Sequence, residues 1–139
     1  MSRSKARESA FKVIFEASFK KDETVGQILD LYYDNNDTSQ LGDETEYFEK
    51  LVNGVIDQKE NYSKLIDKLS IGWKAQRISK VATSILQIAM YEIDHFEDVP
   101  TKVSINEAVE LAKTYDTQNA ASFINGILAT YTSDREKDE

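Results

Sequence analysis

The stretch ISKVATSILQIAMYEIDHF, residues 78–96, decides the fold class of this chain. Its apolar residues recur in alternating steps of three and one, the spacing that places side chains on one face of an α-helix. The members of this face are Ile78, Val81, Ala82, Ile85, Leu86, Ala89, Met90 and Ile93. A face this wide predicts that the stretch is one long helix and the most buried one of the fold.

Apolar residues keep helical spacing on both sides of this stretch. The expected helices run from about Ser2 to Lys20, from Thr24 to Tyr33, over 43–60, around 65–69, over 78–96, over 105–115 and over 124–131. Proline occurs once, and no linker is long enough to divide domains. We therefore expect an all-α fold, a compact bundle of about seven helices that forms one domain over 1–139. The mostly charged tail, 132–139, is expected to fray.

The composition excludes several kinds of site. The chain has 139 residues with no cysteine and a single histidine, His95, so disulfides, thiolate nucleophiles and multi-histidine metal sites are excluded. Its five glycines are scattered singly and form no phosphate-binding loop. No apolar run approaches the ~20 residues of a membrane span. We expect a cytoplasmic protein that is not an enzyme and that has no metal, cofactor, membrane partner or small-molecule substrate.

Two polar features inside apolar segments call for a structural explanation. Glu92 lies within the apolar run Ile85–Ile93, and we expect it to form an ion pair or a hydrogen bond to a neighbouring helix. Ser104 and Glu107 have the spacing of a capping box, in which each side chain binds the backbone amide of the other residue. This spacing predicts that the helix after Pro100 begins at Ser104.

The basic residues are concentrated, although the net charge is −8. Segment 1–21 contains six lysines and arginines but only two acidic residues. Lys74, Arg77 and Lys80 lie in segment 71–91, which contains no acidic residue before Glu92. The region 22–70 carries twelve acidic and four basic residues. Charges act over about 8–10 Å at physiological salt, so a polyanion responds to the nearest basic segment rather than to the total. The acidic region suits a basic protein partner.

Four blocks of sequence, by their order and spacing, resemble the bacterial NusB family of transcription antitermination factors. They are ARESA (6–10), ILQIAMYEI (85–93), VP (99–100) with VSINEAVELAK (103–113), and SFINGIL (122–128). The resemblance runs from about Arg3 to Tyr131. It implies a NusB-like fold that binds the boxA element of nascent ribosomal RNA. It also implies that the chain acts with the ribosomal protein NusE in an RNA polymerase antitermination complex, without catalysis or cofactor.

The resemblance further implies which residues bind RNA. The family's arginine-rich motif falls on Arg3, Ser4, Lys5 and Arg7, and its aromatic contact in the first helix falls on Phe15. A position of the central helix that is often basic falls on Gln87, and two RNA contacts near the last helix fall on Asn119 and Phe123. The basic position is Gln87 here, so we expect one phosphate contact to be lost. Single-stranded RNA is read by stacking and by hydrogen bonds to base edges. We expect Phe123 to be a partly exposed stacking platform, with plain core packing as the alternative.

Two other functions stay open. The first is a protein–protein adaptor of the same fold with weak or no RNA binding, as Gln87 and the thin N-terminal motif suggest. The second is an RNA-binding accessory domain of an RNA methyltransferase. A methyltransferase would need a catalytic domain and a Gly-rich cofactor loop, which this sequence lacks. Because the basic residues are few, we expect the chain alone to bind RNA weakly and to depend on a protein partner.

Overall fold

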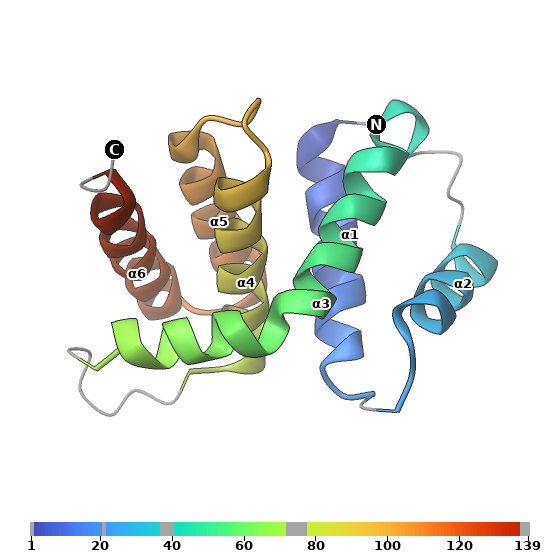
Figure 1. Ribbon diagram of the computed structural model, residues 1–139, viewed down its shortest axis with the longest axis horizontal. Coiled ribbons are helices and arrows are strands. Elements are labelled where there is room, and N and C mark those ends of the chain that lie inside the picture. The colour runs from blue at the N-terminus through green and yellow to red at the C-terminus, as the bar shows by residue number, and fades with distance from the viewer. Residues whose placement is uncertain (1, 21, 37–40, 72–77, 137–139) are drawn as a thin grey trace. The chain divides into compact units, whose positions relative to one another are not determined.

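The computed structural model describes residues 2–20, 22–36, 41–71 and 78–136, with the backbone alone for 134–136. Within these ranges the chain forms six α-helices and one short 3₁₀ helix, and no strand. The elements are α1 (Arg3–Ala17), α2 (Val25–Asn35), η2 (Gly42–Glu44), α3 (Thr45–Leu69), α4 (Lys80–His95), α5 (Thr101–Tyr115) and α6 (Gln118–Glu136) (Figure 1). The expected all-α class is confirmed.

The chain divides into two compact units, Met1–Asp57 and Gln58–Glu139. The first unit contains α1, α2, η2 and the first half of α3, and the second contains the rest of α3 with α4, α5 and α6. The expectation of one domain over 1–139 stays a prediction. Residues 132–136 belong to α6, which continues through Glu136, and the expected fraying of the tail stays a prediction. Residues 137–139 of that tail lie outside the described ranges.

Side-chain caps mark the starts of both helices at the beginning of the first unit; of the two serines that could cap α1, Ser2 and Ser4, the structure uses Ser2. The Ser2 hydroxyl oxygen accepts a hydrogen bond from the backbone amide of Lys5 at 3.2 Å, at the first turn of α1. Thr24 and Gln27 form a complete capping box at the start of α2. Each cap supplies a partner for a helix-end amide that would otherwise have none, and this fixes where the helix starts.

Tyr33 links α2 to α3 within the first unit. Its hydroxyl donates a hydrogen bond to the carboxylate of Glu49. Burial of the Tyr33 side chain, this hydrogen bond and the negative charge of Glu49 raise the pKa of the hydroxyl above its usual range. The proton is therefore held more firmly in the folded chain than in an unfolded one.

Helix α3 is continuous where the sequence predicted two helices, over 43–60 and around 65–69. The predicted interruption between these two ranges, at Asn61, is wrong. The side-chain amide of Asn61 donates to the Gln58 side chain at 2.8 Å on the exposed surface, within a helix that runs from Thr45 to Leu69. The physical reason is that Tyr62 and Ile66, both buried, continue the apolar face beyond Asn61. A polar residue on the solvent side of a helix does not end it.

Helix α4 forms the buried centre of the second unit, as its apolar face predicts. Every residue from Ser84 to Glu92 is buried, and α4 packs against both α5 and α6 (Figure 1). The Ser104 hydroxyl of α5 donates to Oε1 of Glu92 at 2.6 Å, with both residues 1% exposed. The expected hydrogen bond from Glu92 to a neighbouring helix is confirmed.

The predicted capping box at Ser104 is wrong, because α5 begins at Thr101 with Pro100 as its N-cap. Proline has a fixed φ and no amide hydrogen, so it is well suited to the start of a helix. The earlier start places Ser104 one turn inside α5. From there its hydroxyl points to Glu92 rather than to a helix-end amide.

Asp94 joins three helices of the second unit. Its carboxylate accepts hydrogen bonds from the hydroxyl of Tyr62 on α3, at 2.9 Å, and from that of Tyr131 on α6, at 2.7 Å to the nearer oxygen. Both tyrosine side chains are at most 5% exposed. One carboxylate at the end of α4 thus fixes the positions of α3 and α6 against it. In the ranges that the structure describes, no helix is long and apolar enough to cross a membrane.

Candidate nucleic-acid interface

The first turn of α1 carries basic residues and no acidic ones. Arg3 and Lys5 lie there, Lys5 and the neighbouring Ser4 are exposed, and the first turn contains no Asp or Glu. A helix N-terminus carries a partial positive charge, so cations there raise the local potential instead of lowering it. This combination favours a negatively charged ligand at the start of α1.

Arg3 is held by two residues that lie far from it in the sequence. Its Nε donates to Oε2 of Glu44 at 2.5 Å, and its Cζ lies 4.1 Å from the centroid of the Tyr47 ring. The Arg3 side chain is 36% exposed and that of Glu44 is 19% exposed. Sequence reasoning found Arg3 but missed Glu44 and Tyr47, because no local pattern links residues 41 positions apart.

Arg7 is buried, although it belongs to the predicted basic motif. It is 3% exposed, and its Cζ lies 5.7 Å from the same Tyr47 ring. A cation over an aromatic face is stabilised by the ring's negative face, more so when both groups are desolvated. In this structure Arg7 therefore packs within the first unit, and direct RNA contact by Arg7 stays a prediction.

Phe15 belongs to a row of three aromatic rings, two on α1 and the third, Phe19, just after the end of that helix. Phe11 and Phe15 are stacked with centroids 6.0 Å apart, as the four-residue spacing predicts, and Phe15 meets Phe19 edge to face at 5.2 Å. Exposure rises along the row: Phe11 is buried, Phe15 is half-buried and Phe19 is 59% exposed. The same spacing could have pointed to Phe19, which sequence reasoning missed. The row offers an exposed aromatic edge for contact with unpaired bases.

Gln87 is buried in the second unit and binds α3. Its side-chain amide donates to the backbone oxygen of Lys59 at 3.2 Å and to Oγ of Ser63 at 3.1 Å. With 7% of its surface exposed, this side chain fastens α4 to α3. Gln87 therefore has a structural role that sequence reasoning missed, and its contact with RNA stays a prediction.

The two predicted contacts on α6 differ in exposure. Asn119 lies in the first turn of α6 and is exposed, as a residue that binds a base edge must be. Phe123 is 4% exposed, so the expected partly exposed position is wrong and the alternative, core packing, is what the structure shows. Phe123 is thus buried on α6 together with Ile124, Ile127 and Leu128.

Predicted residues thus occur in both units. Arg3, Ser4, Lys5, Arg7 and Phe15 all lie on α1 of the first unit, within its first four turns. Gln87, Asn119 and Phe123 lie on α4 and α6 of the second unit. The exposed or half-exposed members of the set are Arg3, Ser4, Lys5, Phe15 and Asn119.

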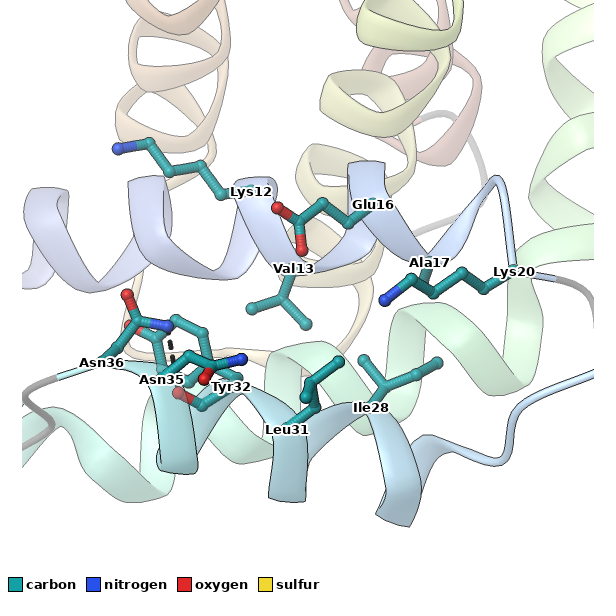
Figure 2. Close-up of a pocket in the computed structure, with 10 residues that line it drawn as sticks. All are labelled: Lys12, Val13, Glu16, Ala17, Lys20, Ile28, Leu31, Tyr32, Asn35 and Asn36. Atoms are coloured by element: carbon teal, nitrogen blue, oxygen red, sulfur yellow. Dashed lines mark hydrogen bonds between the residues drawn. The ribbon is translucent and has the colours of Figure 1, made fainter.

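A hollow of about 210 Å³ lies between α1 and α2 (Figure 2). Val13 and Ala17 of α1 face Ile28 and Leu31 of α2 across it. Charged and amide groups surround this apolar floor, namely Lys12, Glu16, Lys20, Asn35 and Asn36. The lining therefore combines both charge signs around an apolar floor.

The remaining candidate for chemistry is the single histidine of the sequence, which belongs to the second unit. His95 is the last residue of α4, exposed, with its ring 4.3 Å from that of Tyr91. A histidine at a helix C-terminus is favoured by the helix dipole. Among the described residues no group of three or more His, Asp or Glu side chains could hold a metal ion.

Comparison with known proteins gives one consistent match. The model of the NusB family matches residues 4–133. "Transcription antitermination protein NusB" of Clostridium novyi is 43% identical over 128 residues, which cover 92% of this chain and 96% of that protein. The protein of the same name from Bacillus subtilis is 36% identical and covers 99% of both chains. The solved structure of T. maritima NusB is similar, with a TM-score of 0.81, 32% identity, and 94% of this chain and 89% of that chain covered.

Proposed function

This chain belongs to the NusB family of transcription antitermination factors, and from that premise we propose that it binds single-stranded boxA-type RNA together with the ribosomal protein NusE. The protein–RNA complex would then join RNA polymerase in an antitermination assembly. The observation that carries the proposal is the family match over nearly the whole chain, combined with the cationic first turn of α1.

We propose that RNA is held chiefly by α1. Lys5 is exposed and supplies a phosphate contact, and the row that ends in Phe15 and Phe19 supplies stacking. Asn119, exposed on α6, supplies hydrogen bonds to a base edge. With so few exposed cationic groups, RNA binding by the chain alone is weak and its salt dependence is shallow, and NusE provides further contacts.

Acidic residues support the proposed protein partner. Exposed acidic side chains of the first unit include Asp22, Glu23, Asp30, Asp43 and Glu46. Ribosomal proteins are usually basic, and complementary charge accelerates and orients association. We propose that this acidic surface attracts NusE.

Anisotropy titration of a labelled boxA-type RNA tests the proposal, with a scrambled RNA as the control. Each titration is made at two salt concentrations, with and without NusE. We expect selective binding that tightens with NusE. Lys5→Gln should weaken binding and lower the slope of log K against log salt by about 0.7, the value of one phosphate contact on a single strand. Lys64→Gln, an exposed lysine on the second-unit half of α3, is the matched control and should change neither.

A second candidate function is a protein adaptor that does not bind RNA. It is favoured by the burial of three predicted RNA-binding residues, Arg7, Gln87 and Phe123, at 3%, 7% and 4% exposure. The same titration decides between the two. Tight binding of NusE with no RNA binding in any mixture would refute the RNA proposal and support the adaptor.

A further inference from the structure

The start of α6 is tied to the start of α4 by one carboxylate, that of Asp116. Only Asp116 and Thr117 separate α5, which ends at Tyr115, from α6, which begins at Gln118. The Ser79 hydroxyl donates a hydrogen bond to Oδ2 of Asp116 at 2.6 Å. The backbone amide of Thr117 donates to Oδ1 of the same carboxylate at 2.9 Å. The two helix starts therefore meet at the same end of the second unit (Figure 1).

Both residues that bind Asp116 also cap a helix. The Ser79 hydroxyl oxygen accepts a hydrogen bond from the backbone amide of Ala82 at 2.9 Å, in the first turn of α4. The Thr117 hydroxyl oxygen accepts one from the backbone amide of Ala120 at 3.0 Å, in the first turn of α6. Such bonds supply partners for helix-end amides and fix the first turn of a helix. One chain of hydrogen bonds thus runs from the first turn of α4 through Asp116 to the first turn of α6.

Asn119 lies inside the turn that this chain of hydrogen bonds fixes. It is the second residue of α6, between the cap Thr117 and its partner Ala120, and it is exposed. An asparagine side chain offers both N–H donors and an acceptor oxygen, which can pair with the edge of an unpaired base. Recognition of this kind needs the amide at a defined place, which the backbone of the first turn sets.

These hydrogen bonds lie at the surface, so their main effect is local order. Ser79 and Thr117 are exposed and Asp116 is half-buried. Packing of α6 is provided instead by its buried apolar residues, of which the first are Ala121 and Phe123. Helix ends are the parts of a fold that open most readily. Without the link to Ser79, the first turn of α6 would lose its anchor while the rest of the helix stays packed.

We propose that Ser79 and Asp116 are positioning residues for RNA recognition, which hold Asn119 in one place for the edge of a base. This inference rests on the proposed contact between Asn119 and RNA, and it assigns a role to two residues that act through Asn119. A group that is ordered before its ligand arrives loses less conformational entropy on binding. Because Ser79 caps α4, the buried centre of the second unit sets the position of Asn119.

Ser79→Ala tests the proposal, because it removes the hydroxyl and changes no charge. The full chain with NusE is titrated against a labelled boxA-type RNA at several salt concentrations. We expect about fivefold weaker binding, the cost of ordering one side chain on binding, with an unchanged salt slope because no phosphate contact is lost. In an Asn119→Ala background, Ser79→Ala should cause no further loss. Ser79→Thr, which keeps the hydroxyl, should bind like wild type.

Thr24→Ala is the matched control. Thr24 is also an exposed hydroxyl that caps a helix, but it lies at the start of α2 in the first unit. Its substitution removes a cap of the same kind and should leave RNA affinity unchanged. Asp116→Ala is a second variant of the link, and it should couple to Asn119→Ala as Ser79→Ala does. Circular dichroism confirms that every variant is folded.

Nuclear magnetic resonance relaxation measures the order of the turn without RNA. The backbone order parameter of Asn119 should be about 0.85 in wild type, the value of a rigid backbone, and lower in Ser79→Ala and Asp116→Ala. Thr24→Ala should leave it unchanged. A value typical of a flexible loop in wild type would overturn the proposal, because the turn would not be ordered in advance.

The outcomes separate this inference from the function on which it rests. If Ser79→Ala binds RNA like wild type, or weakens binding equally with and without Asn119, the positioning role is overturned and the RNA-binding function stands. If Asn119→Ala binds like wild type, Asn119 does not contact RNA and the positioning role fails with it. If wild type binds no RNA even with NusE, the proposed function itself fails.

Discussion

The hydrogen bond between Ser104 and Glu92 should contribute strongly to the stability of the second unit. Both residues are 1% exposed, and the two oxygens are 2.6 Å apart. Ser104→Ala removes this bond with almost no change in volume. A buried hydrogen bond to a carboxyl group contributes about 1–3 kcal/mol, so we expect unfolding free energy to fall by ~2 kcal/mol. That loss lowers the ratio of folded to unfolded protein about thirtyfold.

Urea unfolding followed by circular dichroism measures this loss. With a slope of about 2 kcal/mol per molar urea, the midpoint should fall by about 1 M while the slope stays constant. Ser122→Ala, on the exposed side of α6, is the matched control and should change stability by less than about 0.5 kcal/mol. In a Glu92→Leu background, Ser104→Ala should also cost less than about 0.5 kcal/mol, because the acceptor is already gone. A wild-type midpoint for Ser104→Ala would refute the role assigned to this bond.

Three further substitutions test other contacts. Tyr131→Phe removes one of the two tyrosine hydroxyls that Asp94 binds, and it should lower the unfolding free energy by about 1 kcal/mol in urea; no loss would contradict that link. Gln87→Ala should cost about 1–3 kcal/mol of stability but leave RNA affinity within twofold, and a larger loss of affinity would show that Gln87 contacts RNA. Above about pH 10, the unfolding free energy of Tyr33→Phe should fall less with rising pH than that of the wild type. Burial and Glu49 raise the Tyr33 pKa in the folded chain. The wild type therefore has its full stability below the pKa of an unfolded tyrosine, and it loses stability as the pH rises from that value toward the pKa of folded Tyr33. Equal pH dependence of the two proteins would contradict it.

Helix type was predictable wherever one apolar face repeats without interruption. The residues from Ile78 to Ile93 alternate steps of three and one, and only an α-helix brings them to one side. Local polar signals were less reliable. Asn61 suggested a break that α3 does not have, and Ser104 suggested a cap one turn too late. At Asn61 the buried face that continues through Tyr62 and Ile66 outweighed a local preference, and at Ser104 a second local signal, Pro100, starts the helix one turn earlier.

The candidate site was only partly predictable for a related reason. The basic and aromatic residues of α1 are visible in the sequence, and Lys5 and Phe15 lie where a ligand can reach them. The burial of Phe123 depends on the helices packed around α6, which one helix's periodicity cannot show. The contact of Arg3 with Glu44 joins residues 41 positions apart, so only the folded chain brings them together.

Transcription through a terminator tests the central claim most directly. A bacterial extract depleted of its NusB would transcribe a template that carries a boxA sequence or a scrambled one upstream of the terminator. We predict that adding this chain increases readthrough only on the boxA template, and that Lys5→Gln requires a higher concentration for the same effect. Equal readthrough on both templates would contradict the account. So would a chain that still binds NusE but produces no readthrough on either template.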